Sequence, residues 1–216
     1  MEDIKGKIKV VSFDWNGTLV NFNDFDKQFW DKLIPELYAK KYNLSFEEAQ
    51  EKVLRKYNRN GSHKAEWYCP SFWFKKFEFK EDLNEELKKP LKVIEIYPET
   101  KEVLKSLKGK YKLICLTRSA KEIVELSLSL LGILDYFDEI FSTVSDFDCP
   151  NKSKDTYLKI CNKMKVKPDE VLHVGDNYER DYLEPKKAGL NVVFLDRTGE
   201  MKDSVKDLRE VETFLN

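Results

Sequence analysis

Short apolar stretches alternate with amphipathic stretches along most of this chain, and that alternation restricts the folds it can adopt. After Ile96, each apolar run has the length of a β-strand and is followed by residues with helical spacing. These runs lie at 111–116, 139–142, 171–174 and 191–195. One earlier run, Ile8–Phe13, adds a further strand. Because strands that alternate with helices build βαβ units, the sequence predicts an α/β fold with a parallel sheet and helices on both faces.

The stretch between the first apolar run and the others is instead helical and aromatic. Its apolar residues recur at spacings of three and four, and Ser45 begins a capping-box pattern, so helices are expected. The aromatic run Trp67–Phe74 is interpreted as the core of a small helical unit, with part of it lining a substrate pocket as the alternative. We therefore predict a helical domain at residues 21–94, inserted into an α/β core domain formed by residues 1–20 and 95–216.

Composition excludes several classes of function. The chain has 216 residues, of which 41% are hydrophobic, and its formal net charge is −1, so no bulk charge favours nucleic acid or a membrane surface. Residues 1–9 alternate in charge and contain no apolar signal segment, and no apolar run approaches the roughly 20 residues that cross a bilayer. The cysteines are far apart and form no paired motif, so we expect reduced thiols in a cytoplasmic protein. They are Cys69, Cys115, Cys149 and Cys161.

Polar side chains follow three of the predicted strands at the points where those strands end. They are Asp14 and Asn16 after the first strand, Thr117 and Ser119 after the second, and Asp176, followed by Asp181, after the fourth. Open parallel sheets bind ligands at the carboxyl ends of their strands, so these groups converge if the strands are neighbours. Lys152 and Lys154 lie in the loop before the helix that precedes the fourth strand.

Such a group of residues favours phosphoryl transfer. Placing the carboxylates of Asp14, Asp176 and Asp181 together costs free energy unless a cation offsets their charge, and hard oxygen ligands with room for water suit Mg²⁺. A cation, a lysine and a hydroxyl donor together suit a phosphate dianion. One carboxylate could then attack phosphorus and form an aspartyl phosphate. Taken singly, these residues have plainer explanations, such as a turn after Asp14 or a helix cap at Asp181.

In this order and on these elements, the residues resemble the four motifs of the haloacid dehalogenase (HAD) superfamily of phosphohydrolases. The matching segments are Asp14-Trp15-Asn16-Gly17-Thr18, Thr117 at the end of a strand, Lys152 in the loop before a helix, and Gly175-Asp176 followed by Asp181. The resemblance covers about residues 5–20 and 96–200, and the helical insert resembles the C1-type cap of that family. It implies a Rossmann-like core with a helical cap above the ends of the strands.

The resemblance also implies a role for each residue. Asp14 would be the nucleophile, with Asn16, Thr117 and Lys152 completing the catalytic set. Thr18, Thr117, Arg118, Ser119 and Lys152 would bind the substrate, and Mg²⁺ would be held by Asp14, the backbone carbonyl of Asn16, Asp176 and Asp181. The prolines that usually fix the loop around the family's lysine are absent, so Lys154 is an alternative to Lys152. His173, inside a predicted strand, is interpreted as a hydrogen-bonded core or surface histidine.

Asn16 departs from the family pattern, in which an Asp at this position serves as general acid and then as general base. An Asn side chain cannot carry or release that proton, and losing such help costs about 10²–10⁴ in rate. Four explanations are open: slow turnover of substrates with good leaving groups, a proton donor elsewhere such as the cap, a binding or regulatory role, or an engineered change. Family branches that cleave carbon–halogen or phosphorus–carbon bonds also lack this Asp. Those branches have other residues at the position, not Asn.

The sequence therefore predicts Mg²⁺-dependent hydrolysis of a small phosphate monoester through an aspartyl phosphate at Asp14. The first alternative is a weakly active relative that binds a phosphorylated ligand in the same pocket. A second alternative is a phosphoacceptor receiver domain, but the long insert after Asp14 and the Gly175-Asp176 motif argue against it. We expect a monomer or a homodimer that acts on a small phosphorylated substrate and binds neither nucleic acid nor a membrane.

Overall fold

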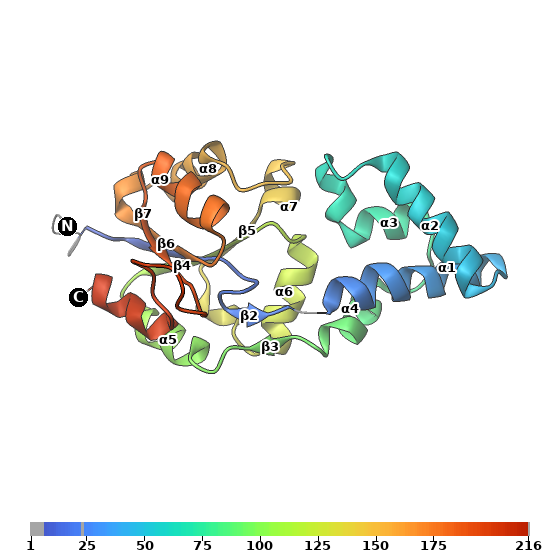
Figure 1. Ribbon diagram of the computed structural model, residues 1–216, viewed down its shortest axis with the longest axis horizontal. Helices are drawn as coiled ribbons and strands as arrows, with labels where there is room; N and C mark the ends of the chain where they lie inside the picture. Colours follow the sequence, from blue (N-terminus) through green and yellow to red (C-terminus); the bar gives the residue numbers. More distant parts are fainter. Residues whose placement is uncertain (1–6, 23, 216) are drawn as a thin grey trace.

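A five-stranded parallel sheet forms the centre of the larger part of the molecule (Figure 1). The structure is a computed structural model that describes residues 7–22 and 24–215. The strands of this sheet are β1 (Val10–Phe13), β4 (Lys112–Thr117), β5 (Glu139–Ser142), β6 (Val171–Gly175) and β7 (Asn191–Phe194). Their order is β5-β4-β1-β6-β7, and every neighbouring pair is parallel. The predicted α/β fold is confirmed, and β1, which ends directly before Asp14, lies in the middle of the sheet.

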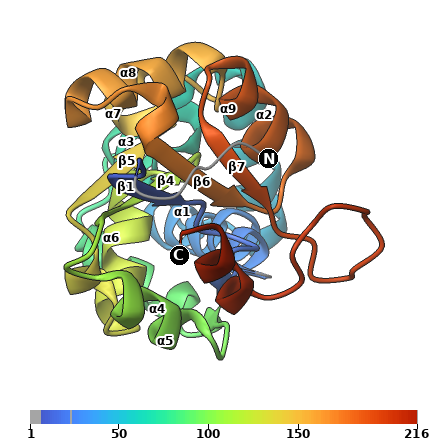
Figure 2. The same cartoon turned by 90° about the vertical axis from the view of Figure 1, so that its left-hand side faces the viewer.

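Helices cover both faces of this sheet, because successive side chains on a strand point to opposite sides. On β1, Val11 and Phe13 pack in one core cluster with α5 and α6, whereas Val10 packs in a second cluster with α8. Figure 2 shows α5 and α6 on one side of the sheet and α7, α8 and α9 on the other. The helices of this part are α5 (Thr100–Leu107), α6 (Lys121–Leu130), α7 (Thr143–Phe147), α8 (Lys154–Met164) and α9 (Glu184–Lys187). Segments of 3₁₀ helix are η3 (Leu134–Tyr136), η4 (Pro168–Glu170) and η6 (Leu208–Phe214), and η5 (Tyr178–Leu183) is a π-helical segment.

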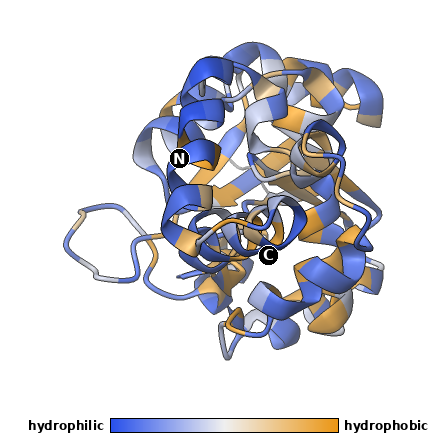
Figure 3. Ribbon diagram, turned by 90° about the vertical axis from the view of Figure 1, so that its right-hand side faces the viewer, coloured by the Kyte–Doolittle hydropathy of each residue, from blue (hydrophilic) through white to orange (hydrophobic). Residues whose placement is uncertain are grey.

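A second group of helices, here called the helical unit, lies beyond one end of the sheet (Figure 1). Its elements are η1 (Lys27–Leu33), α1 (Ile34–Tyr42), α2 (Phe46–Asn60), η2 (Ala65–Tyr68), α3 (Pro70–Lys76) and α4 (Leu83–Leu91). The chain enters and leaves the unit through an antiparallel ribbon of β2 (Val20–Asn21) and β3 (Glu95–Ile96). The sequence did not predict this ribbon, because two residues are too few for strand alternation to be visible. Figure 3 shows hydrophilic and hydrophobic positions mixed along the helices at this end of the molecule, as expected of amphipathic helices.

A row of five aromatic rings, here called the aromatic ladder, joins the loop after β1 to the helical unit. The ring centroids of Trp15 and Phe22 are 4.3 Å apart, and those of Phe22 and Phe25 are 4.4 Å apart. The row continues from Phe25 to Phe29 at 5.5 Å and from Phe29 to Trp30 at 4.6 Å. Such pairs contribute about 0.5–1.5 kcal/mol each beyond the burial of their area. The ladder therefore fixes the start of the helical unit against the sheet.

Several local predictions can be compared with the structure directly. Ser45 forms the predicted capping box. Its hydroxyl accepts from the Glu48 backbone N–H, and the Glu48 carboxylate accepts from the Ser45 backbone N–H. The polar residues 58–62 are typical of a loop, but α2 continues to Asn60 and the chain turns only at Gly61. The amphipathic spacing from Val205 to Leu215 predicts a last helix, and the structure has a shorter 3₁₀ segment that begins at Leu208. Among the described residues, no helix combines the length and apolar character that crossing a bilayer requires.

Candidate active site

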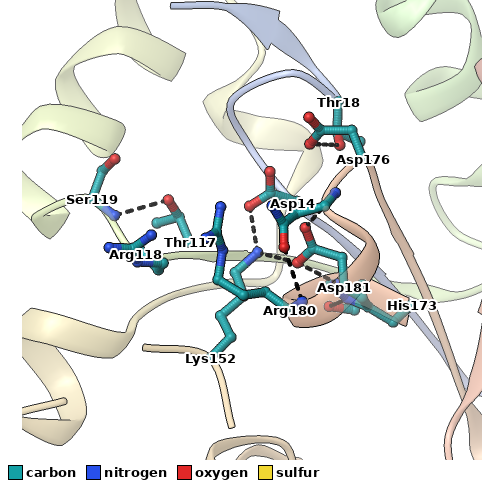
Figure 4. Close-up of polar contacts among 12 residues, drawn as sticks. Asp14, Thr18, Thr117, Arg118, Ser119, Lys152, His173, Asp176, Arg180 and Asp181 are labelled. Atoms are coloured by element: carbon teal, nitrogen blue, oxygen red, sulfur yellow. Dashed lines mark hydrogen bonds and ion pairs between the residues drawn. The ribbon is translucent and has the colours of Figure 1, made fainter. Parts of the chain in front are cut away.

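A cavity of about 260 Å³ lies between the carboxyl ends of the strands and the helical unit. Eight of the nine residues singled out from the sequence line it: Asp14, Asn16, Thr117, Arg118, Ser119, Lys152, Asp176 and Asp181. The sheet order explains this convergence, because β1 lies between β4 and β6 and so places Asp14 between Thr117 and Asp176. The ninth residue, Thr18, is buried, and its hydroxyl donates to Asp176 at 3.3 Å (Figure 4).

Lys152 occupies the centre of the site. Its ammonium group donates to the Asp14 carboxylate and, at 2.6 Å, to Asp181 (Figure 4). Lys152 is only 3% exposed, so both ion pairs are shielded from water. Lys154, the alternative from the sequence, is exposed and begins α8, where its backbone N–H donates to Glu184. The lysine that contacts the carboxylates is therefore Lys152.

Three carboxylates share this centre with that one lysine. Oxygen atoms of Asp14, Asp176 and Asp181 all lie within 4.8 Å of one another. Three negative charges facing one ammonium leave an excess of negative charge, and a hard divalent cation bound by oxygen ligands would offset it. Asp176 is exposed to the cavity, which leaves room for water molecules on a cation with octahedral geometry. The donor set therefore fits Mg²⁺.

Burial and neighbouring charges shift the pKa values of these groups in opposite directions. Burial raises the pKa of Asp14 to about 7, with Asp181 and Asp176 adding to the effect and Lys152 opposing it. Burial alone would also raise the pKa of Asp181, but Lys152 and His173 outweigh it and hold that pKa well below its usual value. The two carboxylates together raise the pKa of Lys152 despite its burial. Near neutral pH, Asp181 and Lys152 therefore both stay charged, and Asp14 is the carboxyl group whose protonation state changes.

Binding of Mg²⁺ should therefore depend on pH through Asp14. A cation needs the ionised carboxylate, and in the metal-free protein the pKa of Asp14 is raised to about 7. Affinity is expected to fall by up to about tenfold per pH unit below that value and to level off above it. Calorimetric titration with Mg²⁺ between about pH 6 and about pH 8 checks this, with proton release measured by comparing buffers. An affinity that does not change over this range would contradict the assignment of Asp14 as the exchanging group.

Gly17 makes room for Asp176. Its φ of +85° is in the left-handed region that glycine adopts at little cost, and a Cβ atom built on it would overlap the Asp176 carboxylate. We expect Gly17→Ala to lower stability by about 1–3 kcal/mol through backbone strain and to weaken Mg²⁺ binding by displacing that carboxylate. Urea denaturation and Mg²⁺ titration measure the two effects. Gly109→Ala, also at positive φ but with open space around its Cβ, should lower stability alone.

The loop after β4 supplies hydrogen-bond donors on the other side of Asp14. The Thr117 hydroxyl accepts from the Ser119 backbone N–H at 3.1 Å, so its own proton is free to point into the cavity. Arg118 is held in place because its Nε donates to the Pro150 carbonyl at 2.8 Å. Its guanidinium carbon is 5.9 Å from the centre of the Tyr68 ring, which belongs to η2 of the helical unit. This loop can therefore bind an anion next to Asp14.

The side chain of Asn16 has a fixed orientation. Its amide oxygen accepts from the Phe22 backbone N–H at 3.1 Å. Because an amide carries its acceptor and its donor on opposite branches, the NH₂ group of Asn16 is the part left to face the cavity that this residue lines. Asn16 can thus donate a hydrogen bond to a bound ligand, but it has no acidic proton to transfer.

His173 contacts the site through Asp181, and the sequence did not reveal this contact. This fully buried side chain lies between Ser12, whose Oγ is 2.9 Å from Nδ1, and Tyr157, whose hydroxyl is 3.0 Å from Nε2. The same Nε2 lies 3.3 Å from Asp181. Because Tyr157 donates to the Arg180 carbonyl, Nε2 carries the imidazole proton, and burial lowers the pKa of His173. His173 pairs in the sheet with Ser12, two residues before Asp14, and this register cannot be seen in the sequence.

Two π-helical segments border the cavity, and such segments are often found at functional sites. One is η5, which carries Arg180 and Asp181, and the other is η1, which carries Trp30. The residues that the helical unit and the segment before it contribute to the cavity lining are Phe22, Asp26, Trp30 and Tyr68. Tyr68 lies in the aromatic run Trp67–Phe74, for which pocket lining was the alternative interpretation, whereas no role was assigned to the other three. The spacing of four between Asp26 and Trp30 was the signal that could have placed those two on one helix face.

The buried Asp14–Lys152–Asp181 group lies at the end of the central strand of a parallel sheet, and comparisons with known proteins identify the family that this chain belongs to. The haloacid dehalogenase-like hydrolase family model matches residues 8–189, so the chain belongs to that family of hydrolases.

Individual relatives of known structure or function share about a quarter of their residues with this chain. The chain is 25% identical over 172 residues to the GMP/IMP nucleotidase YrfG of Escherichia coli (strain K12), covering 79% of this chain and 75% of that one. It is 27% identical over 192 residues to the pyrophosphatase PpaX of Bacillus cereus (strain G9842), covering 85% and 81%. Among solved structures, a HAD phosphatase from Thermococcus onnurineus superposes with a TM-score of 0.72 at 26% identity, covering 95% of this chain and 97% of that one.

Proposed function

We propose that this protein is a Mg²⁺-dependent phosphatase that hydrolyses a small phosphate monoester through an aspartyl phosphate on Asp14. The observation that supports it most is the contact of Lys152 with both Asp14 and Asp181 in a cavity that Thr117 also lines. An ammonium, a hydroxyl and a carboxylate nucleophile are the groups that phosphoryl transfer requires from a protein. The match to nucleotidase and pyrophosphatase relatives is consistent with a phosphorylated substrate.

Each residue has a distinct part in this proposal. Asp14 attacks phosphorus, and the bond to the leaving oxygen breaks as the covalent intermediate forms. Lys152 favours the ionised form of Asp14 and offsets charge on the phosphoryl group, while Thr117 donates to one of the phosphoryl oxygens. Water then cleaves the intermediate and releases phosphate. Bound Mg²⁺, held by Asp14, Asp176 and Asp181, would supply charge compensation for the phosphate.

The helical unit is proposed to be a cap domain of residues 21–94 over a core domain of residues 1–20 and 95–216. Its residues Phe22, Asp26 and Trp30 line the same cavity as Asp14, so closure of the cap would exclude water from the reaction. We place the enzyme in the cytoplasm, where its four cysteines would stay reduced.

A second candidate is a protein that binds a phosphorylated ligand and turns it over weakly, and Asn16 is the observation that favours it. The NH₂ group that Asn16 presents can stabilise a bound phosphate, but it cannot protonate a leaving group. Both candidates use the same cavity and the same cation.

The deciding experiment measures phosphate release from p-nitrophenyl phosphate and from a sugar phosphate, with and without Mg²⁺, for the natural chain and for Asn16→Asp. Mg²⁺-dependent turnover by the chain as it stands supports the phosphatase. Activity that appears only in Asn16→Asp supports the binding protein. No turnover by either, together with no covalent labelling of Asp14, would overturn the proposed function.

A further inference from the structure

Asn16 leaves the reaction without a proton donor, and the helical unit places one other carboxylate in the cavity. Among the described residues that line it, the acidic side chains are Asp14, Asp26, Asp176 and Asp181. Three of them form the carboxylate group around Lys152, which makes them unsuitable as proton donors. Asp26 stands apart from that group, at the start of η1.

Asp26 and Asn16 line the same cavity. The Asn16 amide oxygen accepts from the Phe22 backbone N–H, which holds the segment before the first helix against the loop after β1. Asp26 and Trp30 are four residues apart within the first helical segment, so their side chains share one face, and both line the cavity. Asp26 thus belongs to the part of the cavity wall that the helical unit contributes.

Asp26 is an exposed residue in the wall of the cavity. Asp26 is the residue at the N-terminus of η1, yet its carboxylate makes no capping hydrogen bond. The Trp30 side chain hydrogen-bonds to it, which restricts its orientation. Burial raises the pKa of Asp26, and the nearby Asp31 adds to this, while the hydrogen bond from Trp30 opposes it. Arg118 and Arg180 are the cations that line the same cavity without belonging to the carboxylate group.

We propose that Asp26 is the general acid and base of the reaction, in the role that Asn16 cannot fill; this assignment rests on the proposed phosphatase function. In the first step an Asp14 oxygen bonds to phosphorus, the electron pair of the broken P–O bond goes to the leaving oxygen, and the Asp26 carboxylic acid protonates that oxygen. In the second step water attacks phosphorus and gives a proton to the Asp26 carboxylate. The electron pair of the acyl phosphate bond returns to Asp14, phosphate leaves, and Asp26 is again protonated.

The test compares two aryl phosphates that differ mainly in their leaving groups, p-nitrophenyl phosphate and phenyl phosphate. A poor leaving group needs a proton and a good one does not. Asp26→Asn should therefore reduce kcat/KM about 10²–10⁴-fold for phenyl phosphate and leave it nearly unchanged for p-nitrophenyl phosphate. Adding Asn16→Asp to Asp26→Asn should restore the lost activity, because it returns an acid next to the leaving group.

The matched control is Asp24→Asn, two residues away on an exposed segment. The φ of Asp24 is +65°, which Asn tolerates, so both substrates should react as in the parent. An equal loss on both substrates in Asp26→Asn, no loss on either, or a leaving-group dependence that appears instead in Tyr68→Phe would overturn the assignment. A parent protein that hydrolyses neither substrate would overturn the proposed function itself, which distinguishes the two failures.

Discussion

Asp14→Asn is expected to lose nearly all turnover while the folded protein loses no stability. Removal of the covalent nucleophile lowers kcat by roughly 10⁶-fold in a serine protease, and we expect a loss of similar order here. The stability expectation follows from the sign of the pKa shift. Burial raises the pKa of Asp14 to about 7, so above that pH the ionised side chain destabilises the metal-free fold, and a neutral amide removes that cost.

Two measurements check this expectation. Incubation with a ³²P-labelled substrate followed by acid quenching should label the parent protein and not the variant, and urea denaturation in EDTA should show a midpoint no lower than that of the parent. Asp155→Asn, an exposed carboxylate on α8, is the matched control and should change neither. Retained turnover in Asp14→Asn would contradict the assignment of the nucleophile. Lost turnover with a large loss of stability would point to a structural role instead.

Lys152→Met should destabilise the metal-free protein strongly. Met has a similar volume, so the substitution removes the charge and leaves the carboxylates of Asp14 and Asp181 buried and unpaired. Breaking a buried pair by removing one partner costs about 3–5 kcal/mol. At a pH above 7 the loss should be largest, because protonation of Asp14 relieves it at lower pH. Turnover should also fall, since Asp14 loses its counterion.

Urea denaturation in EDTA and in saturating Mg²⁺ measures this prediction. The cation should stabilise Lys152→Met more than it stabilises the parent, because it supplies charge that the variant lacks. Lys154→Met is the matched control two residues away, and as an exposed side chain it should shift stability by no more than about 0.5 kcal/mol. Equal stability of the two variants would contradict the central position given to Lys152.

Much of the fold could be predicted from the sequence because its elements are long enough to show a period. The parallel sheet, the helices on both faces and the helical insert follow from apolar spacing, and Asp14, Thr117 and Asp176 follow from where the strands end. Lys152 and Lys154 could not be separated in this way. Their sequence positions are nearly equivalent, and only the packed loop buries one and exposes the other.

Other parts of the site depend on contacts between residues far apart in the chain. His173 reads as a core residue within its own strand, and its contact with Asp181 exists only because η5 folds back over β6. Asp26 likewise belongs to no sequence motif, and only its place in the cavity lining suggests a role for it. Thr18 was expected to bind substrate, whereas the structure turns its hydroxyl to Asp176. Such roles depend on tertiary packing, which a single sequence does not display.

The aromatic ladder makes the joint between the two parts of the molecule asymmetric. The rings from Trp15 to Trp30 form a continuous row of tilted, stacked and edge-on pairs across the boundary. At the start of α3, the parts are joined by a polar contact, in which the Ser71 backbone N–H donates to Glu122 at 2.8 Å. A polar contact at a surface costs little to break because water replaces it, whereas separating buried rings exposes apolar area. If the two parts move relative to each other, we therefore expect the contact at Ser71 to open before the row of rings separates.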